Sequence, residues 1–136
     1  MTADSPAAAQ GASAFERLGG EAAVRTLVDR FYDLMDLEPH YAGIRGLHPA
    51  ALEGSRDKLH WFLCGWLGGP DLYVQRLGHP RLRARHLPYA IGQSERDQWL
   101  ACMAQAMRER GIEATLAERL HAAFFNTADW MRNTDG

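Results

Sequence analysis

The sequence is poor in cysteine. Its two cysteines, Cys64 and Cys102, lack the CxxC spacing of zinc and redox sites and lie inside apolar helical patterns. These features argue against a disulfide framework and against a cysteine zinc site. We expect two buried, reduced thiols, as is typical of a cytoplasmic protein.

Long hydrophobic runs and targeting signals are also missing. No segment approaches the roughly 18 consecutive apolar residues of a membrane span. The first cation is Arg17, so the chain does not open with the basic region of a signal peptide. We therefore expect a soluble, cytoplasmic protein with no membrane partner.

Neither sign of charge is in excess. The chain has 15 Lys and Arg and 17 Asp and Glu, a formal net charge of -2. Proteins that bind nucleic acid or anionic membranes carry a basic excess over a face or a whole domain. We therefore expect no nucleic-acid partner.

The length and composition fit one domain. With 136 residues, 46% of them hydrophobic, the chain can bury a core and still hold a small guest molecule. Residues 1–12 consist mostly of Ala, Gly, Ser, Thr and Pro and are predicted to form a disordered leader. The predicted domain spans residues 13–132, and residues 133–136 are a short tail.

No window alternates with period two for long enough to predict a sheet strand, so the fold class is all-α. Ser13 to Glu16 is a capping-box pattern, and Gly19-Gly20 cuts the short helix that it begins. Four main helices, in two crossed antiparallel pairs, are then predicted over about 21–36, 49–67, 94–110 and 115–131. Residues 37–47 are expected to form a loop or a set of short turns, and 72–90 an irregular connection with one short helix ending near Pro88.

A local basic run occupies that connection. Residues 72–94 contain four arginines and two histidines but no Asp or Glu. The run predicts an anionic partner, and nucleic acid, a phosphorylated ligand and a carboxylate-bearing cofactor all remain open on this evidence alone.

His86 is the candidate metal ligand. Leu87-Pro88 follows it and steers the backbone out of helix, which leaves the imidazole at the end of a short element. The six histidines include no i,i+4 pair and no HExxH pattern. A site with one histidine makes sense when a cofactor supplies the other ligands, as a porphyrin does.

Heme would also explain the basic run. Its propionates need cations or donors at the mouth of a pocket, while its ring needs an apolar slot. Taken singly, each candidate would be an ordinary surface group. The candidates are Arg83, Arg85, His79, Tyr73 and Lys58.

Two aromatic residues are placed to offer polar groups to such a pocket. Tyr32 and Trp99 lie at the edges of apolar helical stripes, and buried Tyr and Trp side chains usually find a polar partner. Each alone would more often be a core aromatic.

Together these residues resemble the group II truncated hemoglobins. The resemblance covers about residues 14–132 and is most specific in Gly-His-Pro-Arg-Leu-Arg-Ala-Arg-His, residues 78–86, followed by Trp99. Further matching elements are Phe-Glu-Arg-Leu-Gly-Gly at 15–20, Arg-Phe-Tyr at 30–32, Leu-His-Pro at 47–49 and Trp-Leu-Gly-Gly-Pro at 66–70.

The resemblance implies a two-over-two helical sandwich around heme b, iron protoporphyrin IX, with His86 as the proximal iron ligand. It assigns distal polar groups to Tyr32, Trp99 and His48, where some members of the group carry tyrosine in place of His48. It also places Ser55, Leu59, Phe62 and Leu63 along the distal wall.

The expected function is high-affinity binding of O2 and of other diatomic ligands such as CO and NO. Slow release would suit NO dioxygenation or peroxide reduction, and both reactions need an external electron donor. One alternative is a heme gas sensor that acts through a partner protein. Another is a helical module without heme that binds an anion or nucleic acid through the arginine run. A monomer and a homodimer are both compatible with the sequence.

Overall fold

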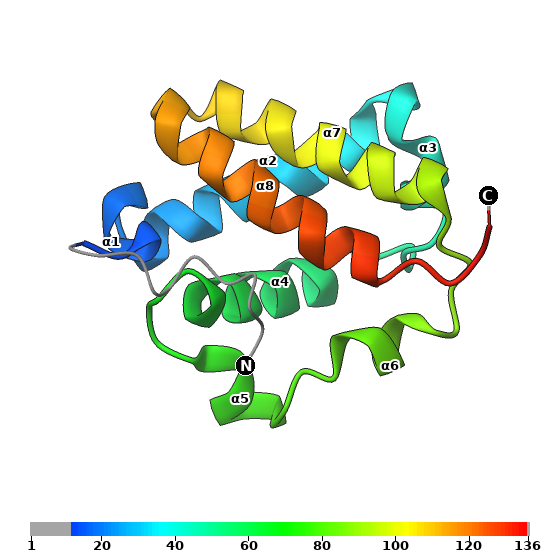
Figure 1. Cartoon of the computed structure of the whole chain (residues 1–136), viewed down its shortest axis with the longest axis horizontal. Helices are drawn as coiled ribbons and strands as arrows, with labels where there is room; N and C mark the ends of the chain where they lie inside the picture. Colours follow the sequence, from blue (N-terminus) through cyan, green and yellow to red (C-terminus); the bar gives the residue numbers. More distant parts are fainter. Residues whose placement is uncertain (1–11, 136) are drawn as a thin grey trace.

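The computed structural model describes residues 12–135, and all regular structure in this range is helical (Figure 1). The predicted leader therefore lies outside the described residues, except for Ala12. Four long helices form the body: α2 (Glu21–Leu37), α4 (Glu53–Trp66), α7 (Gln93–Glu109) and α8 (Ala114–Trp130). The predicted all-α class is confirmed.

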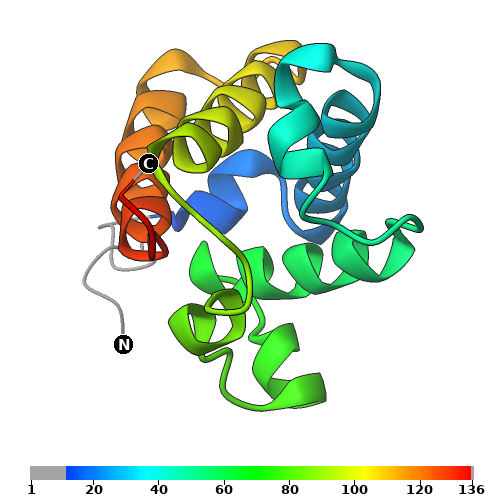
Figure 2. The same ribbon diagram turned by 90° about the vertical axis from the view of Figure 1, so that its right-hand side faces the viewer.

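The long helices pair as the sequence predicts. α7 packs against α8, α2 packs against α4, and α2 also contacts α7, which joins the two pairs. Figures 1 and 2 both show α4 between the α7–α8 layer and two short helices, α5 (Leu72–Leu77) and α6 (Leu82–His86). α6 therefore stands apart from the body.

The core forms where the apolar stripes of the long helices meet. The predicted stripe of α2 is fully buried, with Phe31 and Met35 each at most 1% exposed. Both cysteines are free and buried, and the thiol of Cys102 donates to the Phe31 carbonyl at 3.2 Å. Burial raises the pKa of the Cys102 thiol to about 12, so this cysteine stays protonated.

The first short helix, α1 (Ala14–Leu18), begins and ends as predicted. The Ser13 hydroxyl accepts from the Glu16 amide and the Glu16 carboxylate accepts from the Ser13 amide, which completes the capping box. Gly19 ends the helix with φ 117°, a left-handed conformation that favours glycine. The Phe15 ring then lies over Gly69, where an added Cβ would come within 2.6 Å of the ring.

The helix predicted to begin at Pro49 begins at Glu53, so its first turn was predicted wrongly. The guanidinium of Arg45 donates to the carbonyls of Pro49 and Ala50 at 2.9 Å each, which takes these carbonyls out of helical bonding. Arg45 itself ends α3 (Ala42–Arg45), which follows a 3-10 helix, η2 (Pro39–Tyr41), in the segment predicted as a loop.

The irregular connection contains two short helices where one was predicted. α5 and α6 are separated by Gly78 with φ 80° and by Arg81 with φ 48°, both positive values that interrupt a helix. Helices of five or six residues are too short to show a periodic pattern.

Two predicted helix starts were also misplaced. α7 begins at Gln93, with the Gly92 amide donating to the Glu95 carboxylate at 2.8 Å, rather than at Ser94. α8 begins one residue before Thr115, because the Glu113 carboxylate accepts from the Thr115 amide and caps the helix. In residues 12–135 no helix is both long enough and apolar enough to cross a membrane.

Candidate functional site

A cavity of about 630 Å³ lies among α4, α6, α7 and α8, which is within the usual size range of sites for small molecules and cofactors. Its wall contains all but two of the site residues predicted from the sequence. The predicted residues present in the wall are Tyr32, His48, Ser55, Lys58, Leu59, Phe62, Leu63, Tyr73, Arg85, His86 and Trp99.

His86 ends α6 with its ring half-buried in the cavity wall. Its Nδ1 lies 2.6 Å from the carbonyl oxygen of Leu82, one turn earlier. Because a carbonyl can only accept, Nδ1 carries the proton, and Nε2 of the neutral ring keeps a free lone pair. Histidines that bind a metal usually hold their second nitrogen in this way.

A metal held by His86 would need ligands from a cofactor. Among the described residues no group of three or more His, Cys, Asp or Glu side chains could hold a metal ion. The donor set therefore fits a porphyrin, which supplies four nitrogens of its own, and the single-histidine argument from the sequence stands.

Tyr32 is the most deeply buried polar side chain of the cavity, with 5% of its surface exposed. Burial raises the pKa of its hydroxyl far above the usual value of 10.0, so the hydroxyl stays protonated. The Arg56 guanidinium lies 5.8 Å from the centre of the Tyr32 ring and bonds the Asp33 carboxylate at 2.7 Å. Arg56 of α4, itself bonded to Asp33 of α2, thereby packs against the ring and leaves the hydroxyl available as a donor.

His48 lies beside Tyr32, with ring centres 5.7 Å apart. Its Nδ1 is 2.8 Å from the Ile44 carbonyl, so this nitrogen carries the proton of the neutral ring. Burial lowers the pKa of His48 below 6.5, and the nearby charge of Arg45 adds to the effect. The neutral ring can therefore accept a hydrogen bond at Nε2 but cannot donate one there.

Trp99 projects from α7 among aromatic rings. Its ring centre is 5.1 Å from that of Phe31 and 5.4 Å from that of Phe124. Phe124 in turn stacks on Trp66 at 4.8 Å. These contacts fix the Trp99 indole and make this end of the cavity apolar.

Three of the five residues predicted at the mouth belong to the cavity wall, and they differ in exposure. Lys58 and Arg85 are exposed, and Arg85 donates through Nε to the Pro80 carbonyl at 2.8 Å. Tyr73 is buried and meets the Phe62 ring edge-on at 6.4 Å. Two cations and a phenol thus belong to the wall of a largely apolar cavity, a combination that suits a ring that carries carboxylates.

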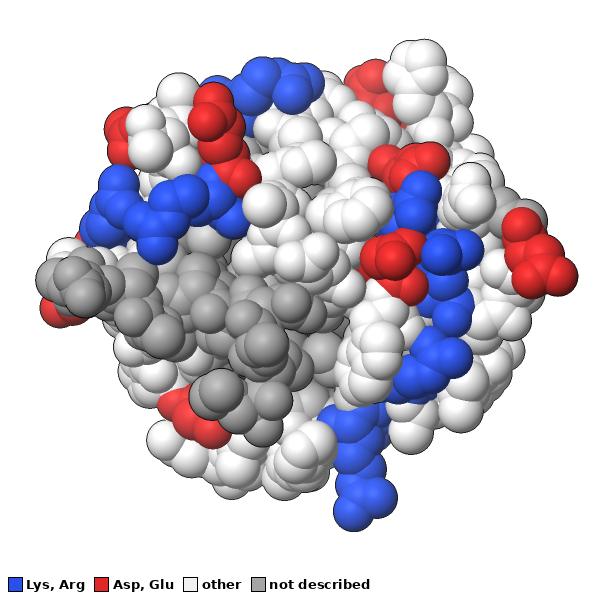
Figure 3. Space-filling view, in the orientation of Figure 1, with Lys and Arg blue, Asp and Glu red and all other residues white. Residues whose placement is uncertain are grey.

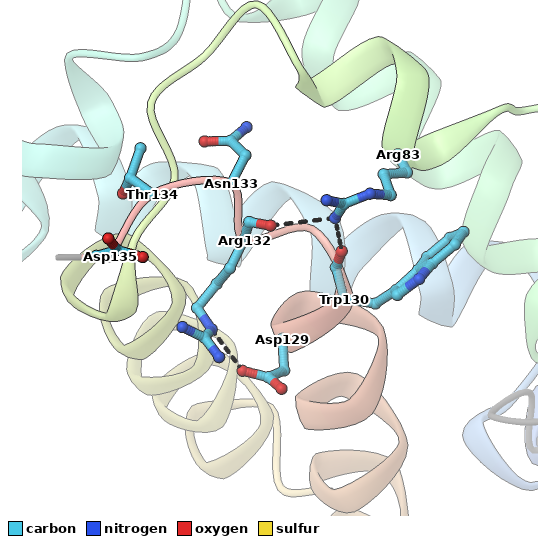
Figure 4. Close-up of a pocket in the computed structure, with 7 residues that line it drawn as sticks. All are labelled: Arg83, Asp129, Trp130, Arg132, Asn133, Thr134 and Asp135. Atoms are coloured by element: carbon cyan, nitrogen blue, oxygen red, sulfur yellow. Dashed lines mark hydrogen bonds and ion pairs between the residues drawn. The ribbon is translucent and has the colours of Figure 1, made fainter.

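Arg83 and His79 lie outside the cavity wall. Arg83 borders an open hollow beside the end of α8, where its guanidinium donates to the carbonyls of Trp130 and Arg132 (Figure 4). His79 is exposed, and its Nδ1 accepts from the Arg81 amide at 3.0 Å. Both side chains therefore have a structural partner within the protein.

Thr127 of α8 is a wall residue that sequence reasoning missed as a site residue. Its hydroxyl is buried and has no hydrogen-bond partner among the described residues. An unpaired buried hydroxyl is costly, so it points to a polar partner that occupies the cavity. Its place on the apolar stripe of the last helix was the signal that could have identified it.

Other wall residues also escaped prediction as site residues, although some of them belong to the motifs that carry the resemblance. They are Ile44, Leu47, Pro49, Trp66, Leu82, Tyr89, Ile91, Glu95, Arg96, Phe124, Ala128 and Met131.

Comparisons with known proteins agree with this geometry. Residues 13–133 match the family described as bacterial-like globin. The chain is 40% identical over 114 residues to group 2 truncated hemoglobin YjbI of Bacillus subtilis, a match that covers 84% of each chain.

Solved structures show the same fold. The group II 2-on-2 hemoglobin of Agrobacterium tumefaciens has a TM-score of 0.87 and 44% identity, covering 93% of this chain and 98% of its own. The cold-adapted truncated hemoglobin of Pseudoalteromonas haloplanktis TAC125 has a TM-score of 0.87 and 40% identity, covering 90% and 99%. An oxygen-avid truncated haemoglobin from Bacillus subtilis has a TM-score of 0.81 and 38% identity, covering 90% and 100%.

These matches extend over nearly the whole described chain and include its cavity. Globins bind heme and small gaseous ligands such as O2, which accounts for an apolar cavity with one histidine at its wall. The chain therefore belongs to the bacterial-like globin family and, within it, to the group II truncated hemoglobins.

Proposed function

We propose that this chain binds heme b in the 630 Å³ cavity and uses it to hold O2 with high affinity. The observation that carries the proposal is His86, whose Nδ1 is occupied by the Leu82 carbonyl while Nε2 remains available in the cavity wall. When bound, heme supplies an iron that takes up a diatomic ligand and exchanges electrons.

Lys58, Arg85 and Tyr73 would hold the two propionates at the mouth. Hydrogen bonds between an ionised donor and a carboxylate are roughly twice as strong as neutral ones. The mouth offers two cations and one phenol, while Phe62, Leu59 and Leu63 line the wall from α4. In this proposal Ser55, on the same helix, leaves a side entrance less obstructed than a bulky residue would.

Tyr32 and Trp99 would donate hydrogen bonds to the ligand. O2 gains negative charge when it binds ferrous heme and CO gains little, so these donors favour O2. If each contributes about 1.5 kcal/mol, the two together raise the O2 binding constant on the order of a hundredfold. The oxygen avidity named for the Bacillus subtilis relative supports this reading.

Slow release favours chemistry on the ligand over delivery of oxygen. One candidate reaction joins NO and O2 with one electron to give nitrate. The other reduces hydrogen peroxide to two waters with two electrons and two protons, and Nε2 of neutral His48 can accept a proton from peroxide. Both reactions need an external electron donor. In this proposal the chain acts in the cytoplasm as a monomer or a homodimer.

The arginine run fits a separate nucleic-acid-binding role poorly. Arg83 bonds the carbonyls of Trp130 and Arg132, and the Arg76 guanidinium lies 4.7 Å from the centre of the Trp61 ring. In Figure 3 some Lys and Arg side chains form a band on the right-hand side, with Asp and Glu side chains beside its upper part, and others lie at the top and upper left. No observation on the structure favours a sensor over an oxygen binder.

Absorption spectra of the oxidised, reduced and CO-bound protein test the proposal. Wild-type protein should show the intense Soret band of heme, and His86→Gly should lose the normal spectrum and regain it with added imidazole. His121→Gly, a change at an exposed histidine of α8, is the matched control and should keep the wild-type spectrum. Failure of the wild-type chain to take up hemin would refute the proposal.

A further inference from the structure

α6, the helix that carries His86, cannot hold its own position. It has five residues, none of them buried, and the following Leu87 is 56% exposed. Isolated helices of this length are unstable in water, and the only apolar side chain of α6 that is even half-buried is that of Leu82, in the cavity wall. Contacts made by other segments must therefore set the position of the imidazole.

The segment after α8 supplies those contacts. The side-chain amide of Asn133 donates to the His86 carbonyl at 3.3 Å and to the Tyr89 carbonyl at 2.8 Å. The Ile91 amide donates to the Asn133 side-chain oxygen at 2.9 Å. One side chain therefore holds three backbone groups of the connection that starts at His86.

Backbone bonds reinforce the side-chain contacts. The amides of Asn133 and Thr134 both donate to the Ile91 carbonyl, at 2.8 and 3.2 Å. From the other direction, Arg83 of α6 reaches the carbonyls of Trp130 and Arg132 (Figure 4). α6 and the segment after α8 are thus joined at both ends of α6.

The segment is itself anchored to the long helices. The Asp129 carboxylate accepts from Arg96 of α7 and from Arg132, each at 2.7 Å. Arg96 also lies over the Phe125 ring, 5.0 Å from its centre. These contacts therefore connect α6, through residues 129–134, to α7 and α8.

We propose that residues 130–134 form a strap that sets the position of the proximal histidine, with Asn133 as its positioning residue. Arg83, predicted from the sequence to hold a propionate, is the second attachment of this strap. The proposal rests on the proposed function only in so far as His86 holds iron, because the strap exists in the chain itself.

Amide hydrogen exchange on the full-length protein tests the strap without reference to heme chemistry. Asn133→Ala should accelerate exchange of the amides of residues 87 and 89–91 by about tenfold, the loss expected from one to two ordinary hydrogen bonds. Asn126→Ala, an exposed position on α8, should leave them unchanged. Unchanged exchange in Asn133→Ala would overturn the strap.

The vibration of the iron–histidine bond in the heme-loaded, reduced protein tests the positioning role. Asn133→Ala should shift or broaden this band in the resonance Raman spectrum, while the Soret band stays present. Asn133→Asp keeps the oxygen that accepts from Ile91 but loses both donors, and it should shift the band as well. An unchanged band in both variants would refute positioning, whereas absence of heme would refute the proposed function alone.

Discussion

Nδ1 of His48 lies 2.8 Å from the carbonyl oxygen of Ile44, the last buried residue before the loop that leads to α4. This bond fixes the tautomer of the ring and leaves Nε2 without a proton. His48 consequently differs in chemistry from Tyr32 and Trp99, although all three line the same cavity.

The lowered pKa of His48 predicts a pH dependence of stability. Between pH 6.5 and the lower pKa of the folded state, the unfolded chain binds more protons than the folded one, so stability falls as the pH falls. In denaturant titrations from pH 7.5 to 5, His48→Gln should lose stability less steeply than wild type. His40→Gln, at an exposed position, should follow the wild-type slope. Parallel curves for wild type and His48→Gln would show that burial does not hold this ring neutral.

Hydrogen bonds from Tyr32 and Trp99 to bound O2 should slow its release. Tyr32→Phe and Trp99→Phe should each speed release by about tenfold, and the double variant by up to about a hundredfold, because each removes one hydrogen bond of about 1.5 kcal/mol. Stopped-flow replacement of O2 by CO measures the rate.

Tyr41→Phe is the matched control for these donors. Tyr41 is also buried, but its hydroxyl donates to Gln105 at 2.7 Å and lies outside the cavity wall. Its substitution should leave O2 release at the wild-type rate. If the Tyr32→Phe, Trp99→Phe double variant releases O2 no faster than wild type, these two side chains do not stabilise bound O2.

The unpaired hydroxyl of Thr127 predicts a difference between the heme-free and heme-loaded chain. Thr127→Val keeps the shape of the side chain and removes the hydroxyl, so it should stabilise the heme-free chain by about 1 kcal/mol. This gain in stability should become smaller or turn into a loss in the heme-loaded chain if a polar group of the cofactor pairs with Thr127. Chemical denaturation of both forms measures these differences.

Thr26→Val is the comparison for Thr127. The Thr26 hydroxyl donates to the Ala22 carbonyl at 3.0 Å on the exposed side of α2, so its removal should bring no such gain in either form. A heme-free Thr127→Val chain that is less stable than wild type would mean that the hydroxyl has a partner in solution.

The long helices, and His86 as the candidate ligand, could be predicted because each follows from a local pattern. The apolar spacing of α2 extends over several turns, and His86 stands out because Pro88 and the arginines surround it in the sequence. The capping box of Ser13 involves residues three apart, so it could also be read directly.

The remaining features depend on side-chain contacts that no periodic pattern shows. The start of α4 is set by Arg45 reaching forward to two carbonyls, and Arg83 leaves the cavity wall because Trp130 and Arg132 offer carbonyls to it. The role of Asn133 could not be predicted from the sequence, since its three backbone partners lie more than 40 residues earlier. Periodicity cannot report such pairings.

Lys58 is exposed and belongs to the cavity wall, so it can be labelled chemically next to the cavity. It is the only lysine in the sequence, so, apart from the amino terminus, a reagent selective for primary amines meets a single target. A fluorophore attached there would sit beside the cavity, and its quenching would report filling of the cavity in real time. The single lysine thus provides a specific labelling site for kinetic measurements.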